Sequence, residues 1–250
     1  MQKQAHAQKQ LLLVSTSTTH GTGYLDHCES EIKEILGNRK SILFVPYARP
    51  SGRTYEEYTD IARERFKKMG IKLMGIHEHR NQDLIEAVED AEAIFIGGGN
   101  TFVLLKALYD VGNGKGVMNA IKKKVNSGTP YIGTSAGSNV AGKTIMATND
   151  MPIVFPPSFE AMGLVPFIIN PHYIDPNPDS KHMGETRETR IKEYHVFNKE
   201  VVVGLREGAM LHIIGDKVQL KGTVGARIFR QGKEATEHKP GEELDFLMIL

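Results

Sequence analysis

Segment 133–137, with the sequence GTSAG, has the residue types of a nucleophile elbow, a tight turn that exposes a serine hydroxyl for attack on a carbonyl group. Gly133 lies two residues before Ser135 and Gly137 two residues after it. A Cβ at either position would crowd such a turn. The apolar residues before it are typical of a strand, and Ala136 can begin a helix whose N–H groups would face the reacting carbonyl oxygen. An ordinary Gly/Ser turn has the same residue types, but the strand–turn–helix context favours Ser135 as a nucleophile.

A second glycine-rich segment, 97–101 with the sequence GGGNT, also follows a predicted strand. Three glycines let the backbone approach a ligand closely and adopt positive φ angles. The segment could therefore supply a second N–H group to an oxyanion. A phosphate-binding loop is an alternative, but the Walker lysine and the G-x-G-x-x-G spacing are both missing from this segment. A tight turn without a ligand is a third interpretation.

A serine hydroxyl needs a base to take its proton, and histidine most often serves. Of the ten histidines, four come after predicted strands and one more lies in a loop: His20, His77, His79 and His172, with His182 in the loop. His172 differs from the others because Pro171 precedes it, and proline restricts the backbone that would aim the ring. This gives His172 a modest advantage and leaves the others open, since a single histidine is more often structural.

The third member of such a site is a carboxylate that orients the imidazole. Glu207 comes two residues after a predicted strand over 201–205, at the edge of the sheet where ligands bind. Asp150 and Asp175 lie in other turns and are competing candidates. For each of the three, the alternative is an exposed turn carboxylate with no role in chemistry.

Arg187 lies near the start of a predicted helix over 184–197. It is four and seven residues from Ile191 and Tyr194, so the three side chains share one face, which the other two should turn toward the core. An arginine on that face either forms a salt bridge or binds a substrate carboxylate. The helical spacing alone slightly favours the salt bridge.

These candidates must be positioned by an alternation of short apolar runs and amphipathic stretches in the first half of the chain. The apolar runs predict buried strands at 11–15, 41–47, 71–76, 93–96 and 130–133. The stretches predict helices at 28–36, 54–69, 101–109 and 117–125, and one that contains 84–88. Near-continuous apolar strands are typical of parallel sheets covered on both faces, and the alternation indicates βαβ units. The predicted fold class is α/β with a doubly wound, mostly parallel sheet, which binds ligands at the carboxyl ends of its strands.

The second half of the chain is less regular. Strands are predicted at 164–170 and 201–205, and short β runs from Met210 onward are broken by glycine-containing turns. These runs predict C-terminal β-hairpins attached to the sheet. The sequence has no linker rich in Pro, Gly or Ser and no internal repeat. We therefore expect Met1–Gln10 to be a flexible tail and 11–250 to form a single domain.

Composition excludes several classes of protein. The chain has 250 residues, of which 31 are basic and 30 acidic, and its net charge of +1 gives no basis for general binding to nucleic acid or to a membrane surface. The single cysteine, Cys28, cannot form an intramolecular disulfide, which fits a reducing compartment. No apolar run reaches the roughly 18 residues of a membrane span, and Leu11–Val14 is shorter than a signal-peptide core. We expect a cytoplasmic protein that binds neither nucleic acid nor membrane.

Six segments between Ile94 and Gly208 carry a resemblance to a known family. In chain order they are IFIGGGNTFVLLKAL, YIGTSAGSN, TNDMPIV, INPHY, GETRETRI and GLREG. Together they resemble peptidase E, the α-aspartyl dipeptidase family of serine peptidases, and the opening segment LLLVSTST fits as well. INPH and GETRE are far more specific than the elbow. The resemblance covers most of the chain, least clearly at its two ends.

The resemblance implies a flavodoxin-like sheet related to class I glutamine amidotransferases, and a Ser-His-Glu triad at Ser135, His172 and Glu207. This chain order differs from that of α/β-hydrolases, in which the acid precedes the histidine. The resemblance also implies oxyanion donors at the backbone N–H groups of Gly99 and Ala136. It implies no metal and no other cofactor.

Substrate contacts follow from the same resemblance. Arg187 would bind the β-carboxylate of an N-terminal aspartate, with Asn100 as a further contact, and Asp150 could hold the α-ammonium group. The family commonly carries an aromatic residue where this chain has Thr134, a difference that could change the pocket wall. The implied partner is a small Asp-X peptide, and a homodimer is a compatible assembly.

Three other functions compete with this prediction. One is a cyanophycinase-like peptidase, which also cleaves beside aspartate but on a polymer. Another is a serine esterase of broader specificity. The third is a binding protein that kept the elbow but lost turnover, against which the full set of Ser135, His172 and Glu207 argues.

Overall fold

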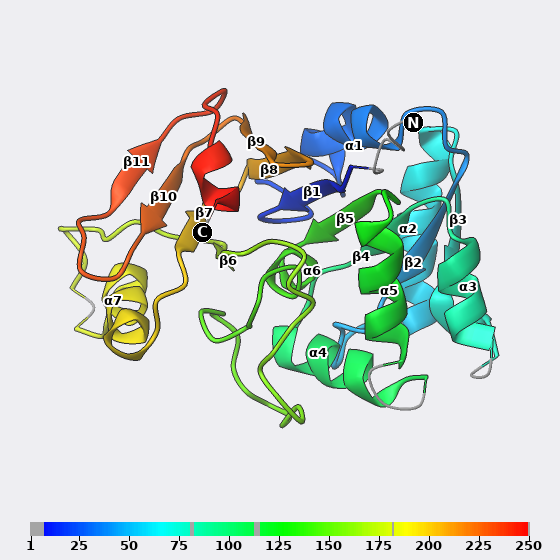
Figure 1. The fold of residues 1–250 in the computed structure, drawn as a ribbon, viewed down its shortest axis with the longest axis horizontal. Coiled ribbons are helices and arrows are strands. Elements are labelled where there is room, and N and C mark those ends of the chain that lie inside the picture. Colours follow the sequence, from blue (N-terminus) through cyan, green and yellow to red (C-terminus); the bar gives the residue numbers. More distant parts are fainter. Residues whose placement is uncertain (1–7, 81–82, 113–115, 182, 250) are drawn as a thin grey trace, which may run out of the picture.

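The structure, a computed structural model, describes residues 8–80, 83–112, 116–181 and 183–249. Two β-sheets lie side by side in it, and helices cover both faces of the larger one (Figure 1). None of the helices in these ranges combines the length and the apolar character that crossing a membrane requires.

The larger sheet has seven strands in the order β3-β2-β4-β5-β1-β8-β9. Its parallel strands are β1 (Gln10–Val14), β2 (Ser41–Val45), β3 (Lys72–Gly75), β4 (Ile94–Ile96) and β5 (Tyr131–Thr134). An antiparallel pair, β8 (Ala209–Ile214) and β9 (Lys217–Gly222), extends the sheet beyond β1. With β2 counted as first, β3-β2-β4-β5 follow the 2-1-3-4 order of a flavodoxin-like sheet. The predicted fold class is confirmed.

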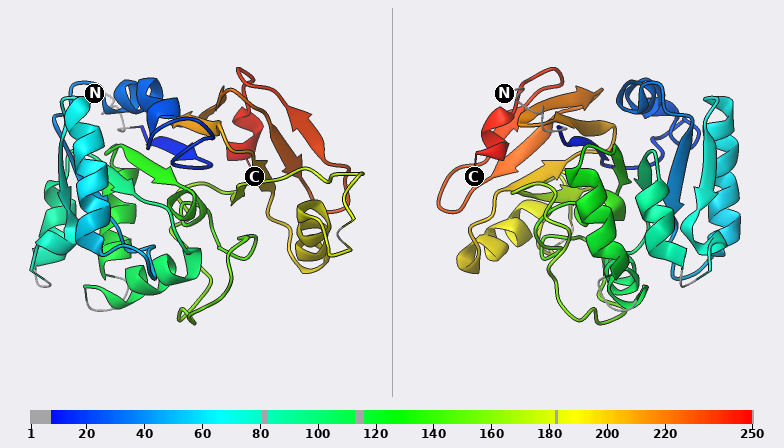
Figure 2. Two further views of the ribbon diagram at one scale, coloured as in Figure 1. Left: turned by 180° about the vertical axis from the view of Figure 1, so that it is seen from behind. Right: turned by 45° about the vertical axis from the view of Figure 1, so that its right-hand side comes forward.

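The parallel strands are buried on both faces because helices pack on each side. Along β1, Leu11 and Leu13 belong to one apolar core, whereas Leu12 and Val14 belong to the other. The first core is covered by α3 (Leu84–Asp90), α4 (Thr101–Asp110) and α5 (Gly116–Asn126). The second is covered by α1 (Glu29–Leu36) and α2 (Tyr55–Lys68), and α2 comes to the front in the left panel of Figure 2.

The smaller sheet has four strands in the order β11-β10-β7-β6. They are β6 (Ile168–Pro171), β7 (Val202–Leu205), β10 (Ala226–Phe229) and β11 (Thr236–His238). β6 and β7 run parallel, and β10 pairs antiparallel with both β7 and β11. Helix α7 (Arg187–Phe197) connects β6 to β7 and packs Ile191 and Tyr194 against this sheet. Figure 1 shows the smaller sheet and α7 beside the larger sheet.

The sequence predicts β-hairpins attached to one sheet, whereas the structure has a separate second sheet. The place beside β1 is taken by β8, so β6 and β7 pair with each other outside the larger sheet. Helix α7 begins later than the spacing predicts, because Thr186 is its N-cap and accepts the N–H of Thr189. Short helical turns lie between other elements at η1 (Asp26–Cys28), η2 (Ile76–Glu78) and α6 (Ala136–Asn139), and η4 (Asp245–Met248) follows β11.

The predicted tail overlaps the first strand, since β1 begins at Gln10. Residues 1–7 of that tail lie outside the described ranges. The single domain over 11–250 stays a prediction.

The carboxyl ends of β1, β2, β4 and β5 meet at one edge of the larger sheet, because these strands are parallel. The smaller sheet joins this edge through Ser15, which follows β1. The Ser15 hydroxyl donates to the carbonyl of Leu205, the last residue of β7, at 2.7 Å, and the Ser15 N–H donates to Ala209 at 3.1 Å. Residues that follow β6 and β7 therefore reach the strand ends of the larger sheet.

Candidate active site

Ser135 lies between β5 and the single-turn helix α6, as the elbow pattern predicts. Its backbone has φ 52° and ψ −109°, a region that residues other than glycine rarely adopt. Both elbow glycines pack against backbone. A Cβ on Gly133 would lie 2.6 Å from the carbonyl oxygen of Gly137, and one on Gly137 would overlap the carbonyl oxygen of Ile96. The strained turn is therefore held by packing that leaves no room for a side chain.

We expect Gly137→Ala to destabilise the fold, because the new Cβ must push β4 and α6 apart. Overpacking of this kind costs about 1–3 kcal/mol, measured as a lower midpoint of urea unfolding. Gly116→Ala is the matched control, since a Cβ there meets only Ile85 Cδ1, at an ordinary contact distance of 3.5 Å. Equal midpoints for the two variants would contradict the close packing of the elbow.

His172 stands between Ser135 and Glu207 and contacts both through its ring. Its Nε2 lies 2.8 Å from Ser135 Oγ, and its Nδ1 lies 2.6 Å from Glu207 Oε1. Because a carboxylate only accepts hydrogen bonds, Nδ1–H donates to Glu207, and Nε2 is left to accept from the serine hydroxyl. The structure thus brings these three predicted side chains together in the order Ser, His, Glu.

The backbone that aims the imidazole is also unusual. His172 has φ 53°, and among the described residues other than glycine only Ser135 and Leu25 share a positive φ. The His172 N–H donates to Ser15 Oγ at 2.9 Å, and that hydroxyl donates in turn to β7. Ser15 is fully buried, so it fixes the turn after β6 against both sheets. The sequence alone did not identify Ser15 as part of the site. Its one indication there was that the segment LLLVSTST fits the family resemblance.

The other histidines considered as bases lie elsewhere. His77 Nε2 is 3.1 Å from Glu56 Oε2, His79 borders a pocket beside β2 and β3, and His20 is exposed. His182 lies outside the described residues. Of the described candidates, His172 is the one that meets the elbow serine.

The competing carboxylates have partners of their own. Asp150 Oδ2 accepts the N–H of Thr101 at 2.7 Å. Asp175 accepts two hydrogen bonds from Arg206, at 2.6 and 2.7 Å. Among the three acids that the sequence left open, Glu207 is therefore the one in contact with the imidazole.

The loop after β4 approaches Ser135 at Gly98, and the described hydrogen bonds do not use the N–H group of its next residue, Gly99. The amides around it donate elsewhere, Gly97 to Val45, Gly98 to the Tyr58 hydroxyl and Asn100 to Ala48. Gly99 has φ 148°, and a Cβ on it would overlap the Ala48 carbonyl oxygen, so glycine is required. Ala136 is the first residue of α6, and its N–H has no partner within the helix. The two predicted oxyanion donors thus come from the ends of neighbouring strands.

Asn100 and Asp150 both serve the start of α4. Asn100 is the N-cap, with its side-chain oxygen accepting from Val103 at 3.1 Å, and its amide donates to the Met151 carbonyl at 2.9 Å. Asp150 accepts from the next residue of the helix, Thr101. The two side chains therefore tie the segment around residue 150 to the glycine-rich loop.

Arg187 is the first residue of α7 and is half-buried. Within the described part of the chain it forms no ion pair, so the salt bridge that helical spacing favours is not found there. Burial lowers the pKa of its guanidinium, Arg190 lowers it further, and the charge of Asp150 raises it. Both arginines line a pocket of about 370 Å³. An unpaired, partly desolvated guanidinium in a pocket is suited to a carboxylate.

Thr134 ends β5 and is fully buried. Its hydroxyl has no hydrogen-bond partner among the described residues. The buried side chain therefore packs inside the fold directly before Ser135, and a change of the pocket wall at Thr134 stays a prediction.

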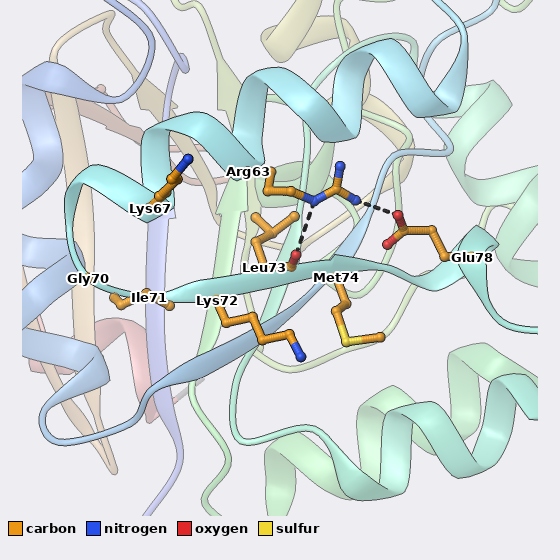
Figure 3. A pocket seen from close by; sticks show the side chains of 8 residues that line it. All are labelled: Arg63, Lys67, Gly70, Ile71, Lys72, Leu73, Met74 and Glu78. Atoms are coloured by element: carbon orange, nitrogen blue, oxygen red, sulfur yellow. Dashed lines mark hydrogen bonds and ion pairs between the residues drawn. The ribbon is translucent and has the colours of Figure 1, made fainter.

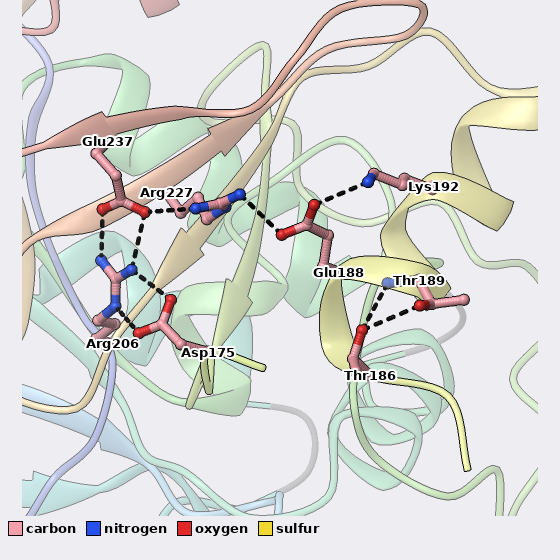
Figure 4. Close-up of polar contacts among 8 residues, drawn as sticks. All are labelled: Asp175, Thr186, Glu188, Thr189, Lys192, Arg206, Arg227 and Glu237. Atoms are coloured by element: carbon pink, nitrogen blue, oxygen red, sulfur yellow. Dashed lines mark hydrogen bonds and ion pairs between the residues drawn. The ribbon is translucent and has the colours of Figure 1, made fainter. Parts of the chain in front are cut away.

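A group of ion pairs holds the segment next to Glu207 (Figure 4). Arg206 donates two hydrogen bonds to Asp175 and two more to Glu237, at 3.0 and 3.1 Å. Asp175 follows His172 by three residues, and Glu237 lies in β11. The Arg206 guanidinium thus links the two chain segments that carry the base and the candidate acid.

The same group of ion pairs continues to α7. Glu237 also accepts from Arg227 at 3.0 Å, and Arg227 pairs with Glu188 at 2.9 Å (Figure 4). Glu188 directly follows Arg187 in the first turn of the helix. The arginine that borders the pocket is thereby fixed relative to the smaller sheet.

We expect Arg206→Met to lower the stability of the fold by on the order of 1 kcal/mol at neutral pH, because its ion pairs are partly exposed. The hydrogen bonds from Arg206 hold the pKa of Asp175 below its usual range. A carboxyl group whose pKa is lowered by folding stabilises the folded state fully above its unfolded pKa of about 4, and this stabilisation is lost as pH falls through its folded pKa. The Tm difference from wild type should therefore be full at pH 7 and shrink toward pH 3. A difference that does not change with pH, or an equal one in the exposed Lys233→Met, would contradict this.

A pocket of about 830 Å³ lies at the far edge of the larger sheet, between α2 and the edge strand β3 (Figure 3). Arg63 donates to the Leu73 carbonyl at 3.4 Å there and pairs with Glu78. β2 and β4 separate β3 from β5, so this pocket does not belong to the site around Ser135. In the described ranges, no group of three or more His, Cys, Asp or Glu side chains is placed to hold a metal ion.

Known proteins are similar to this chain in sequence or in fold. Peptidase E of Streptomyces coelicolor is 45% identical over 238 residues, which cover 95% of this chain and 94% of that protein. A probable alpha-aspartyl dipeptidase of Drosophila melanogaster is 42% identical over 243 residues, covering 96% and 98%. The crystal structure of a peptidase from an acI-B1 Actinobacterium has the same fold, with a TM-score of 0.73 at 20% identity and coverage of 96% and 97%. The family model of peptidase family S51 matches residues 11–221, and this chain therefore belongs to that family.

Proposed function

We propose that this chain is a serine dipeptidase that hydrolyses dipeptides with an N-terminal aspartate. The observation that carries the proposal is the hydrogen-bonded series from Ser135 Oγ through the His172 ring to Glu207 Oε1, with separations of 2.8 and 2.6 Å. The relatives support the class of reaction, and the one from Drosophila is a probable alpha-aspartyl dipeptidase.

In the first step, His172 Nε2 takes the proton of Ser135 as Oγ attacks the scissile carbonyl carbon. Glu207 keeps the ring in the tautomer with a proton on Nδ1 and stabilises the imidazolium that forms. The carbonyl oxygen becomes negatively charged and accepts hydrogen bonds from the N–H groups of Gly99 and Ala136. Removing one such donor from a serine protease costs about 2.7–4 kcal/mol of barrier.

The second half of the cycle uses the same groups. His172 donates the proton from Nε2 to the leaving amine, the C–N bond breaks, and an ester between Ser135 and the aspartyl group remains. A water molecule then gives a proton to Nε2 and attacks this ester. Collapse of the second tetrahedral intermediate returns that proton to Ser135 Oγ and releases aspartate.

Arg187 and Asp150 interact electrostatically and carry opposite charges, which fits an aspartate at the N-terminal position. The unpaired Arg187 guanidinium would bind the β-carboxylate. One oxygen of Asp150 caps Thr101, and the other would hold the α-ammonium group. A free α-ammonium exists only at a chain terminus, which favours a dipeptidase over an enzyme that cuts within a polymer. Both polar atoms of Asn100 are engaged by α4 and Met151, so we assign Asn100 to the shape of the oxyanion loop.

The proposal is tested by Arg187→Met with Asp-Leu and Ala-Leu as substrates. A hydrogen bond to a charged group is worth about 1.5–3 kcal/mol, so kcat/KM for Asp-Leu should fall roughly 10–200-fold. The rate for Ala-Leu, which has no β-carboxylate, should change little and serves as the internal control. Equal losses on both substrates would mean that Arg187 supports the fold, and its assignment to the substrate would be wrong.

A further inference from the structure

Arg49, in the loop after β2, carries a charge that pairs with no carboxylate among the described residues. Its guanidinium carbon lies 4.8 Å from the centre of the Tyr58 ring, a cation–π contact that fixes the group in place. Its Nε is buried and has no hydrogen-bond partner, and within the described ranges no carboxylate pairs with it. Arg206 and Arg227, by contrast, each pair with two acids.

Contacts connect Arg49 to the oxyanion loop. The hydroxyl of Tyr58, on which Arg49 stacks, accepts the N–H of Gly98 at 2.9 Å. A Cβ on Gly98 would lie 3.0 Å from Ser135 Cβ, so this loop touches the elbow. Ala48, directly before Arg49, accepts the N–H of Asn100 at 2.7 Å. Arg49 therefore borders the glycine-rich loop that flanks the candidate nucleophile.

The order of the strands places Arg49 away from the other charged groups of the site. Four consecutive strands of the larger sheet are, in order, β2, β4, β5 and β1. The residues that follow them are, in the same order, the loop of Arg49, the glycine-rich loop, Ser135 and Ser15. His172 approaches from Ser15 and the smaller sheet, and Arg187 belongs to α7 on that same sheet. Arg49 is thus an unpaired cation on the β2 side of the nucleophile.

We infer that Arg49 binds the free carboxylate of the leaving residue X, an inference that rests on the proposed function. An Asp-X dipeptide has three charged groups, of which Arg187 and Asp150 account for the β-carboxylate and the α-ammonium. The remaining group is the carboxylate of X, one residue beyond the scissile carbonyl, where consecutive residues are about 3.8 Å apart. A guanidinium stacked on an aromatic ring presents its N–H groups as a planar fork, which matches a carboxylate. Arg49 thereby makes the enzyme select dipeptides over longer or blocked peptides.

The test compares Asp-Leu with Asp-leucinamide, which lacks the terminal charge, in wild type, Arg49→Met and Arg49→Lys. Wild type should prefer Asp-Leu in kcat/KM by about 10-fold or more. Arg49→Met should lose that preference, because its kcat/KM for Asp-Leu falls while its kcat/KM for Asp-leucinamide changes less than about threefold. Arg49→Lys should keep part of the preference. Arg53→Met, which removes an exposed arginine from the same loop, is the matched control and should behave as wild type.

Other results of this experiment would show whether the role of Arg49 or the proposed function is wrong. Equal wild-type rates on the two substrates would overturn the role of Arg49 and leave the proposed function intact. If Arg49→Met lowered kcat/KM equally for both Asp substrates and left it unchanged for Ala-Leu, Arg49 would bind the aspartate side chain instead. An equal fall on all three substrates would mean a structural role. If wild type cleaved neither Asp substrate, the proposed function and the inference would both be wrong.

Discussion

Ser135→Ala is expected to reduce kcat for Asp-Leu by on the order of 10⁶-fold, the loss that follows removal of the serine in a comparable triad. Without Oγ there is no nucleophile for His172 to activate and no acyl-enzyme to form. Alanine accepts the same backbone conformation as serine, at φ 52°, so the fold should survive. The measurement is aspartate release at high enzyme concentration, together with the Tm.

Ser30→Ala provides the control for this variant, because Ser30 is exposed on α1 and its hydroxyl donates to the neighbouring Glu31. It should retain full activity. Turnover by Ser135→Ala above a hundredth of the wild-type rate, with the fold intact, would exclude Ser135 as the nucleophile.

Glu207→Gln is expected to reduce kcat by about 10³–10⁴-fold, with little change in KM. The amide is neutral, so it stabilises the imidazolium of His172 far less than the carboxylate does. Its NH₂ group can also turn toward Nδ1 and favour the tautomer with the proton on Nε2, which cannot accept the proton of Ser135. The side chain of Glu207 is 55% exposed, and water can therefore replace part of its effect.

Asp150→Asn is the comparison that separates the two acids. Asp150 bonds to the first turn of α4, so its loss should act on substrate binding and on helix capping, which is worth about 1 kcal/mol of stability. The kcat of this variant should remain well above that of Glu207→Gln. If Asp150→Asn abolished acylation while Glu207→Gln still turned over, the assignment of the acid would be wrong.

The larger sheet could be predicted because its strands are short apolar runs that helices cover on both sides. Consecutive residues of β1, such as Leu11 and Leu12, enter different cores, and this requires an unbroken apolar strand. The smaller sheet could not be predicted, because the pattern of 164–170 and 201–205 indicates strands but not their partners. The pairing was decided by β8, which occupies the place beside β1.

Parts of the site could also be read from local residues. The elbow requires glycine at 133 and 137, where packing leaves no room for a Cβ, so its spacing is visible in the sequence. The choice among histidines and acids depended on segments far apart in the chain. Ser15 contacts His172 across 157 positions, and Arg206 contacts Asp175 across 31. No local pattern encodes such contacts.

Charges were the hardest feature to predict, because their partners come from distant elements. The spacing of Arg187 on its helix favoured a salt bridge, yet the acid of that first turn, Glu188, pairs with Arg227 of the smaller sheet instead. Arg49 had no signal in the sequence, since its position depends on the fold bringing Tyr58 beneath it. Only the folded chain shows which arginines remain unpaired.

Cleavage after an N-terminal aspartate by Ser135 can be measured as the release of aspartate from Asp-Leu and of alanine from Ala-Leu, with wild type and Ser135→Ala in parallel. Wild type should prefer Asp-Leu by about 10²-fold or more in kcat/KM, as expected for an ion pair to one carboxylate, and Ser135→Ala should cleave neither dipeptide. Comparable wild-type rates on the two dipeptides would contradict the aspartate specificity and point to a broader hydrolase. An absence of turnover by wild type on both would point to a binding protein.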